Sequence, residues 1–82
     1  MQNLHLTIIS PVEKLYDGDV TSVILPGKVA PFTVLDKHAP IISSLAAGPI
    51  VFVSAGAENE SSIDIEGGFV EVSDNVVTVC VS

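Results

Sequence analysis

The chain has 82 residues, which is enough for one domain and too few for two, so we expect a single domain over residues 1–82. Ten acidic residues oppose three lysines and no arginine, and the net charge is −7. This charge excludes nucleic acid as a partner and argues against docking on an anionic lipid surface, because phosphate-rich surfaces need a clustered basic face.

Several other features of the composition limit the compartment and the core. The single cysteine, Cys80, permits no internal disulfide and fits a reducing cytoplasm. Residues 1–10 do not have the pattern of a signal peptide, and no run approaches the ~20 apolar residues that cross a bilayer, so we expect a soluble domain. Hydrophobic residues make up 48% of the chain. Either the β core is dense, or a partner covers part of the apolar surface.

Alternating apolar and polar residues predict short strands along the whole chain. Leu4, Leu6 and Ile8 alternate with polar residues, as in a half-buried strand. The sequence Asp17-Gly18-Asp19 is a turn signal, so we expect separate strands before and after it. The predicted strands cover residues 4–8, 12–16, 20–25, 32–35, 41–47, 50–53, 63–66, 69–72 and 76–81.

Two of these segments, and the glycine pair between two others, need further comment. Residues 41–47 would tolerate a helix, but strands surround them and we expect a strand. Residues 50–53 are apolar at every position, which is typical of a strand covered on both faces. Gly67-Gly68 interrupts an alternating pattern and indicates a bulge or a close backbone approach. The fold class is therefore all-β, a small sandwich or flattened barrel of about eight to ten short strands.

The sequence contains no convincing catalytic pair. Asp36 and His38 stand two residues apart in a proline-bounded loop, where such side chains more often cap turns than orient each other for catalysis. No serine or cysteine stands in a nucleophile motif. Asp64 and Glu66 share one strand face, but nothing indicates the cleft that a hydrolytic pair needs. We expect no enzyme.

Metal and cofactor sites are equally unsupported. His5, His38 and Cys80 are too few and too scattered for zinc, and Cys80 alternates with valines as a buried or half-buried thiol does. Gly67-Gly68 lacks the lysine and the helix that follow a phosphate-binding loop. We expect no metal and no cofactor.

Taken in order, several segments resemble one family. They are His5-Leu6, Tyr16-Asp17-Gly18, Leu25-Pro26-Gly27, Phe32-Thr33-Val34-Leu35, His38-Ala39-Pro40-Ile41, Leu45, Gly48, Gly67-Gly68-Phe69-Val70-Glu71-Val72 and Val76-Val77-Thr78-Val79. Across essentially all 82 residues the chain resembles the N-terminal β-sandwich domain of the epsilon subunit of F-type ATP synthase.

The resemblance implies a non-catalytic rotor component of the central stalk. Such a subunit binds the gamma subunit and the c ring, and it couples ion translocation to ATP synthesis from the cytoplasmic face of the bacterial membrane. By the resemblance, Ser10, His38 and Ser43 match positions that face gamma, and the loop of Lys28, Val29, Ala30 and Pro31 matches the loop that touches the c ring. His38 equally fits a loop cap.

Two departures from the family limit what the resemblance implies. The family's c-facing loop usually carries acidic residues and glycines, whereas this one reads Val29-Ala30-Pro31-Phe32-Thr33, and Asp36-Lys37 stands where Pro-Gly is common. A packing contact to the c ring is therefore the alternative to a polar one. Many members also continue into two inhibitory helices that bind ATP. If Ser82 ends the native chain, we expect no inhibition by that route.

The alternative from another class is a stand-alone β-sandwich module that binds an unrelated protein or a small ligand. It would need a concave apolar pocket with a few polar groups.

Overall fold

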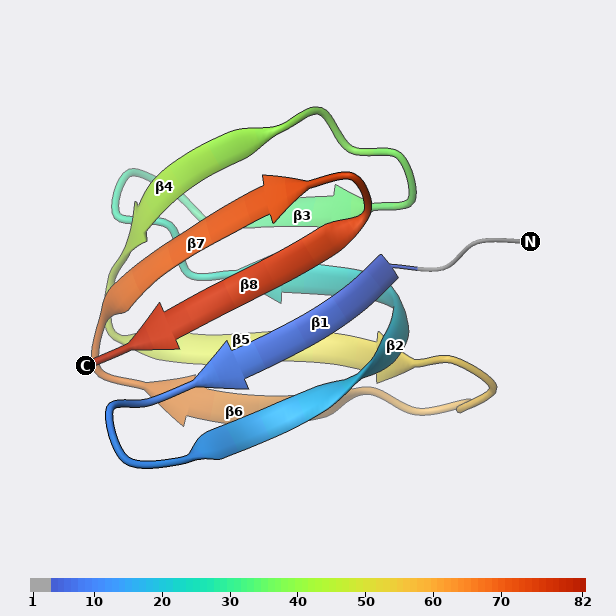
Figure 1. The fold of residues 1–82 in the computed structure, drawn as a ribbon, viewed down its shortest axis with the longest axis horizontal. Coiled ribbons are helices and arrows are strands. Elements are labelled where there is room, and N and C mark those ends of the chain that lie inside the picture. The colour runs from blue at the N-terminus through green and yellow to red at the C-terminus, as the bar shows by residue number, and fades with distance from the viewer. Residues whose placement is uncertain (1–3) are drawn as a thin grey trace.

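The computed structural model describes residues 4–82 and contains eight strands in that range (Figure 1). Residues 1–3 of the predicted domain, and of the segment searched for a signal peptide, lie outside the described residues. The strands are β1 (Leu4–Ile9), β2 (Lys14–Leu25), β3 (Phe32–Leu35), β4 (Ile41–Leu45), β5 (Gly48–Ser54), β6 (Ser61–Ile65), β7 (Gly68–Ser73) and β8 (Val76–Val81). The all-β class and the expected number of strands are confirmed.

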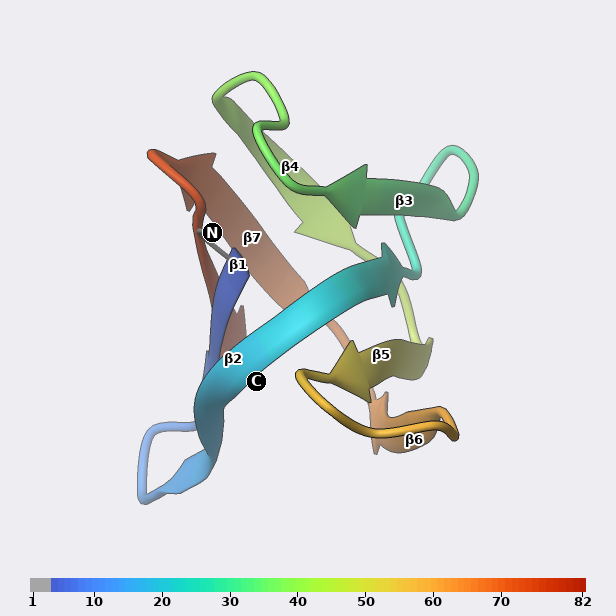
Figure 2. The same cartoon turned by 90° about the vertical axis from the view of Figure 1, so that its right-hand side faces the viewer.

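The strands form one sheet that folds into two layers. The hydrogen-bonded order is β4-β7-β8-β1-β2-β5-β6, and β3 pairs with β2 beside this path. β4, β7, β8 and β1 lie in one layer, whereas β3, β5 and β6 lie across the core from them (Figure 2). β2 contributes to both layers, because its first half pairs with β1 and its second half pairs with β3 and β5.

The length of β2 corrects the sequence prediction. Residues 12–16 and 20–25 were expected to be two strands separated by a turn at Asp17-Gly18-Asp19, and that prediction is wrong. These three residues continue β2 and pair in register with β1, with Asp17 opposite Thr7 and Asp19 opposite His5. The aspartates turn outward and bond across the strands, so charge that commonly marks a turn here belongs to the solvent face of a strand.

A bulge in β2 keeps the core continuous through its bend. The register with β5 shifts between Val20 and Ser22. One extra residue at this point changes which face the following side chains take. Val20 is therefore buried before the shift and Val23 and Leu25 after it, although they do not share one alternating pattern. The buried core consists of Leu4, Leu6, Ile8, Val20, Val23, Leu25, Val34, Leu45, Ile50, Phe52, Ile65, Val70, Val72, Val77 and Val79.

Two further strand predictions have different outcomes. Residues 41–45 form a strand, which confirms β structure in that segment up to Leu45. Residues 50–53 were expected to be covered on both faces, and this prediction is wrong. Ile50 and Phe52 are buried, whereas Val51 and Val53 are only half-buried. β5 lies in an outer layer of the sandwich, so one of its faces turns to the surface.

One asparagine links two connections and the start of β1 at the same end of the sandwich. Asp74 and Asn75 form the β7–β8 turn with positive φ angles of 51° and 63°, as a tight two-residue hairpin requires. The Asn75 side chain accepts from the backbone N–H of Lys37 at 2.7 Å and donates to Asp36 at 2.5 Å. Its carbonyl accepts from the N–H of His5 at 2.9 Å. Asn75 thereby holds the β3–β4 connection against β1.

The close backbone approach predicted at Gly67-Gly68 is confirmed at Gly68. A Cβ added there would lie 2.1 Å from the carbonyl oxygen of Cys80, and the φ of Gly68 is +146°. Both facts require glycine, because β7 and β8 approach more closely here than any side chain permits.

We expect Gly68→Val to destabilise the fold by about 3 kcal/mol or more, because it combines a steric clash with an unfavourable φ. Urea unfolding checks this. Gly56→Ala is the matched control: its φ is +82°, but an added Cβ would meet nothing within 4 Å, so it reports backbone strain alone. A change of less than about 0.5 kcal/mol in Gly68→Val would contradict the close approach.

Candidate protein-binding surface

The three residues predicted to face a partner do not form one cluster. Ser10 lies in the β1–β2 connection at one end of the sandwich, and His38 lies in the β3–β4 connection at the other end (Figure 1). Ser43 lies in β4 between these ends. Each residue lines a different surface hollow. One partner could touch all three only by lying along the length of the molecule.

Ser10 has a structural role in its own connection. Its hydroxyl oxygen accepts from the backbone N–H groups of Val12 at 3.3 Å and Glu13 at 3.1 Å, and the hydroxyl donates to the carbonyl of Glu13 at 3.1 Å. The N–H of Ser10 also donates to the Glu13 carbonyl. This serine turn ends β1 and reverses the chain into β2.

His38 also bonds locally. Its backbone N–H donates to the carbonyl of Leu35 at 3.1 Å, and its Nδ1 lies 2.7 Å from the carbonyl of Ala39. Asp36 bonds to Asn75 instead of to His38, so the two residues do not form a catalytic pair. Lys37 between them has a φ of 64°. The contact between His38 and Ala39 therefore supports the interpretation of His38 as a loop cap. The His38 residue is still half-exposed.

Ser43 lies beside the loop that was predicted to meet the c ring. It is half-buried opposite Val70 of β7, and it lines a hollow together with Lys28, Val29 and Ala30. The structure thus brings Ser43 next to the predicted c-ring loop, and the predicted gamma surface and c-ring surface adjoin along β4.

The loop from Lys28 to Pro31 is anchored at its base. The N–H of Lys28 donates to the carbonyl of Ser44 at 3.3 Å, and the N–H of Ala46 donates to the carbonyl of Pro26 at 2.8 Å. At Gly27 an added Cβ would lie 2.5 Å from the carbonyl oxygen of Ala30, so the loop folds closely over a residue without a side chain. Val29 at the tip is fully exposed, at 102%.

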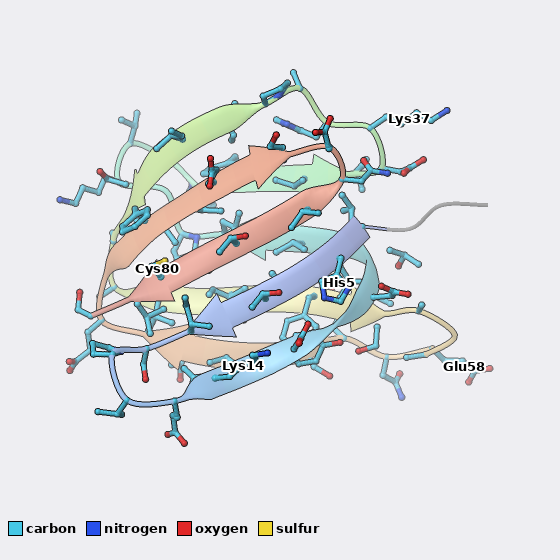
Figure 3. The ribbon with its side chains drawn as sticks, viewed as in Figure 1. His5, Lys14, Lys37, Glu58 and Cys80 are labelled. Atoms are coloured by element: carbon cyan, nitrogen blue, oxygen red, sulfur yellow. The ribbon has the colours of Figure 1, made fainter. Side chains whose placement is uncertain are left out.

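A cross-strand ion network covers the outer face of β1 and β2. His5 on β1 is held between two carboxylates of β2, with Nδ1 2.9 Å from Asp19 and Nε2 2.5 Å from Asp17. Lys14 bonds the second oxygen of Asp17 at 3.0 Å, and Thr7 also donates to Asp17 at 3.4 Å. Figure 3 shows His5 on β1, with Lys14 on the neighbouring β2.

The geometry of this network favours the charged imidazole. Both ring nitrogens face carboxylates, which only accept, so both must carry protons to bond. The hydrogen bonds to Asp19 and then to Asp17 raise the pKa of His5 above 6.5. The bond from Lys14 and then that from His5 lower the pKa of Asp17. The alternation of Asp17 and Asp19 in the sequence is compatible with this network, but the network can be inferred only once the β1–β2 register is known.

Within residues 4–82 the structure gives no support for a metal site or for a hydrolytic pair of carboxylates. No group of three or more His, Cys, Asp or Glu side chains in that range could hold a metal ion. Asp64 and Glu66 are both exposed, and Cys80 is half-buried, as expected from the sequence. In the same range no helix has the length and hydrophobicity needed to cross a membrane.

Comparison with known proteins supplies the family. Residues 3–82 match the family described as the beta-sandwich domain of the ATP synthase delta/epsilon chain. The ATP synthase epsilon chain of Chlorobium limicola is 43% identical over 70 residues, which cover 85% of this chain and 78% of that protein. The chain belongs to the ATP synthase delta/epsilon family. The resemblance inferred from the sequence motifs is confirmed.

Longer relatives and solved structures add two facts. The epsilon chain of Leptospira borgpetersenii serovar Hardjo-bovis (strain JB197) is 40% identical over 93% of this chain, but the match spans only 58% of that protein. A chain in the mitochondrial ATP synthase structure of Euglena gracilis superposes with a TM-score of 0.87 at 23% identity, covering 96% of this chain and 50% of that one. One from Tetrahymena thermophila gives 0.79 at 22%, covering 98% and 63%. These structures support the fold.

We expect the stability that His5 contributes to be fully present below about pH 6.5 and to be lost as the pH rises through the higher folded-state pKa. His5→Gln should therefore lower the melting temperature more at about pH 5.5 than at about pH 8.5. A double-mutant cycle with Asp19→Asn checks the partner: coupling should appear at the lower pH and weaken in 1 M salt (about 3 Å Debye length). Equal coupling at both pH values would contradict the network.

Proposed function

We propose that the chain is a non-catalytic central-stalk subunit of an F-type ATP synthase that binds the gamma subunit and the c ring and couples ion translocation to ATP synthesis. The observation that carries this proposal is the family match over residues 3–82. In this proposal the chain sits peripherally at the cytoplasmic face of the bacterial membrane, as part of the complex.

The physical demand on such a subunit is resistance to deformation under torque. A sandwich meets this demand because its layers share one close-packed core and one continuous hydrogen-bonded path. Its connections are held as well: the Ser10 turn, the Asn75 contacts and the base of the loop from Lys28 to Pro31 all carry specific hydrogen bonds. Side chains on connections held in this way would keep their spacing while the stalk rotates.

The gamma surface in this proposal includes Ser10, His38 and Ser43. Since these residues lie at both ends and along β4, gamma would contact the sandwich over most of its length. A stable interface buries about 800 Å² on each partner and involves about 20–30 residues, which is compatible with so extended a contact. Ile42 beside Ser43 is 76% exposed and would supply apolar area to it.

The c-ring surface in this proposal is the loop of Lys28, Val29, Ala30 and Pro31. Val29 projects from the tip and no acidic residue stands in the loop, so the contact is one of packing. The bonds of the loop base to β4 reduce the conformational entropy that would be lost on docking.

We expect the chain to co-purify with its cognate gamma subunit and the double variant His38→Glu/Ser43→Glu to lose that association by at least about tenfold, because it places charge inside the interface. Circular dichroism must show the variant folded, since Ser43 is half-buried. Ala57→Glu, on the exposed β5–β6 connection, is the matched control and should bind gamma normally. If wild type and gamma elute apart with both folded, the family supplies the fold alone.

We expect Val29→Asp to weaken binding of the chain–gamma complex to detergent-solubilised c ring, because it replaces the exposed apolar tip by a charge. Its free energy of unfolding should change by less than about 0.5 kcal/mol, as the side chain is fully exposed. The control Ala57→Asp adds the same charge away from the loop. Retention of c ring equal to that of the control would contradict a packing contact at Val29.

A further inference from the structure

The free edge of β6 exposes unpaired backbone groups. β6 ends the hydrogen-bonded path of the sheet and pairs only with β5 among the described residues. The N–H of Ala55 donates to Asp19 of β2, so every second residue of β5 back from Ala55 turns its backbone toward β2. The β5 residues between these turn their backbone toward β6 and bond to the β6 residues opposite them. The remaining residues of β6 turn their backbone the other way, so the N–H and C=O groups of Ser62 and Asp64 point outward.

A hollow lies where the end of β6 meets the start of β2. Its apolar lining includes Val12, Leu15, Ile65 and Val81. Val12 is 88% exposed and Leu15 is 38% exposed. β6 and the first half of β2 belong to opposite layers of the sandwich (Figure 2), and among the described residues no strand pairing joins them along this side. An inward-pointing side chain of an added strand would face this hollow.

The rim of the hollow is acidic. Glu13, Asp64 and Glu66 all line it, and none of them pairs with a lysine or histidine in residues 4–82. Asp64 is exposed while its neighbours Ile63 and Ile65 turn toward the core, so its carboxylate lies on the outer face of the layer. Outward side chains of an added strand would lie beside it.

We propose that this side of the sandwich binds an extended segment of a partner protein in which apolar and basic side chains alternate. The segment pairs with Ser62 and Asp64 as an additional strand. Its apolar side chains enter the hollow beside Leu15, and its basic side chains lie next to Asp64 and Glu66. A second copy of this chain is a poor occupant, because its own β6 edge carries the same negative charges. The inference goes beyond the proposed function and is tested on the chain alone, because Ser10 of the proposed gamma surface also lines this hollow.

The test uses the isotope-labelled chain and a synthetic blocked peptide, Lys-Val-Lys-Val-Lys-Val. We expect saturable binding, with amide shifts at Ser62, Asp64 and Leu15 and hydrogen exchange slowed by at least about tenfold at Ser62 and Asp64. A peptide of equal charge with proline in place of two valines should not bind, because it cannot donate to the strand edge.

Two variants test the edge and the charge separately. Ser62→Pro should fold, since its N–H points away from β5, and should lose at least about tenfold in affinity for the peptide. Asp64→Lys/Glu66→Lys should lose as much. Glu58→Lys/Glu71→Lys makes the same change of charge on the β5–β6 connection and the outer face of β7, and should bind as wild type does. Figure 3 shows Glu58 at the tip of its connection.

Three results would overturn the proposal. The peptide could fail to bind, or it could bind both double variants equally, which would indicate attraction to the net charge alone. Protection of Ser62 and Asp64 without peptide, rising with protein concentration, would identify a second copy as the occupant. Each result is independent of whether gamma co-purifies.

Discussion

The structure depends on the ability of one strand, β2, to belong to both layers. Its first half extends the β1 side of the sandwich, and its second half carries β3 and β5. The shift between Val20 and Ser22 makes this possible, because an uninterrupted alternation would turn either Val20 or Val23 out of the core. Tyr16 reinforces the bend, since its hydroxyl lies 3.0 Å from that of Ser54 and its ring packs 4.4 Å from that of Phe52.

This arrangement decides where the molecule is closed and where it is open. The path runs without a break from β4 to β6, and the bridge between Gly27 and Leu45 brings the end of β2 back to β4. One side of the sandwich is thereby closed by backbone contacts. The side between β6 and the start of β2 has no such bridge among the described residues. A rigid subunit of this kind can contact its neighbours through loops fixed by hydrogen bonds and through its one open side.

The sequence predicts what depends on local alternation and fails where long-range register decides. Leu4, Leu6 and Ile8 are buried as their alternation indicates, and Gly68 makes the predicted close approach. Asp17-Gly18-Asp19 was misassigned because turn and solvent-facing strand have the same composition there, and only pairing with His5 distinguishes them. Of the candidate site, Ser10, His38 and Ser43 came from the family resemblance, and sequence alone could not show that their elements carry them to different parts of the surface. The roles of Asn75 and Tyr16 had no local signal.

Part of the acidic charge of the chain can be understood from its unpaired edge. A free strand edge invites pairing with any extended chain, including a second copy, and charged residues on the edge are a common defence. Asp64 and Glu66 give β6 this protection, yet the backbone groups of Ser62 and Asp64 stay available. Negative charge does not block the edge equally against all partners. It repels acidic chains and attracts basic ones, so the same residues that prevent self-association select the charge of the segment that can bind.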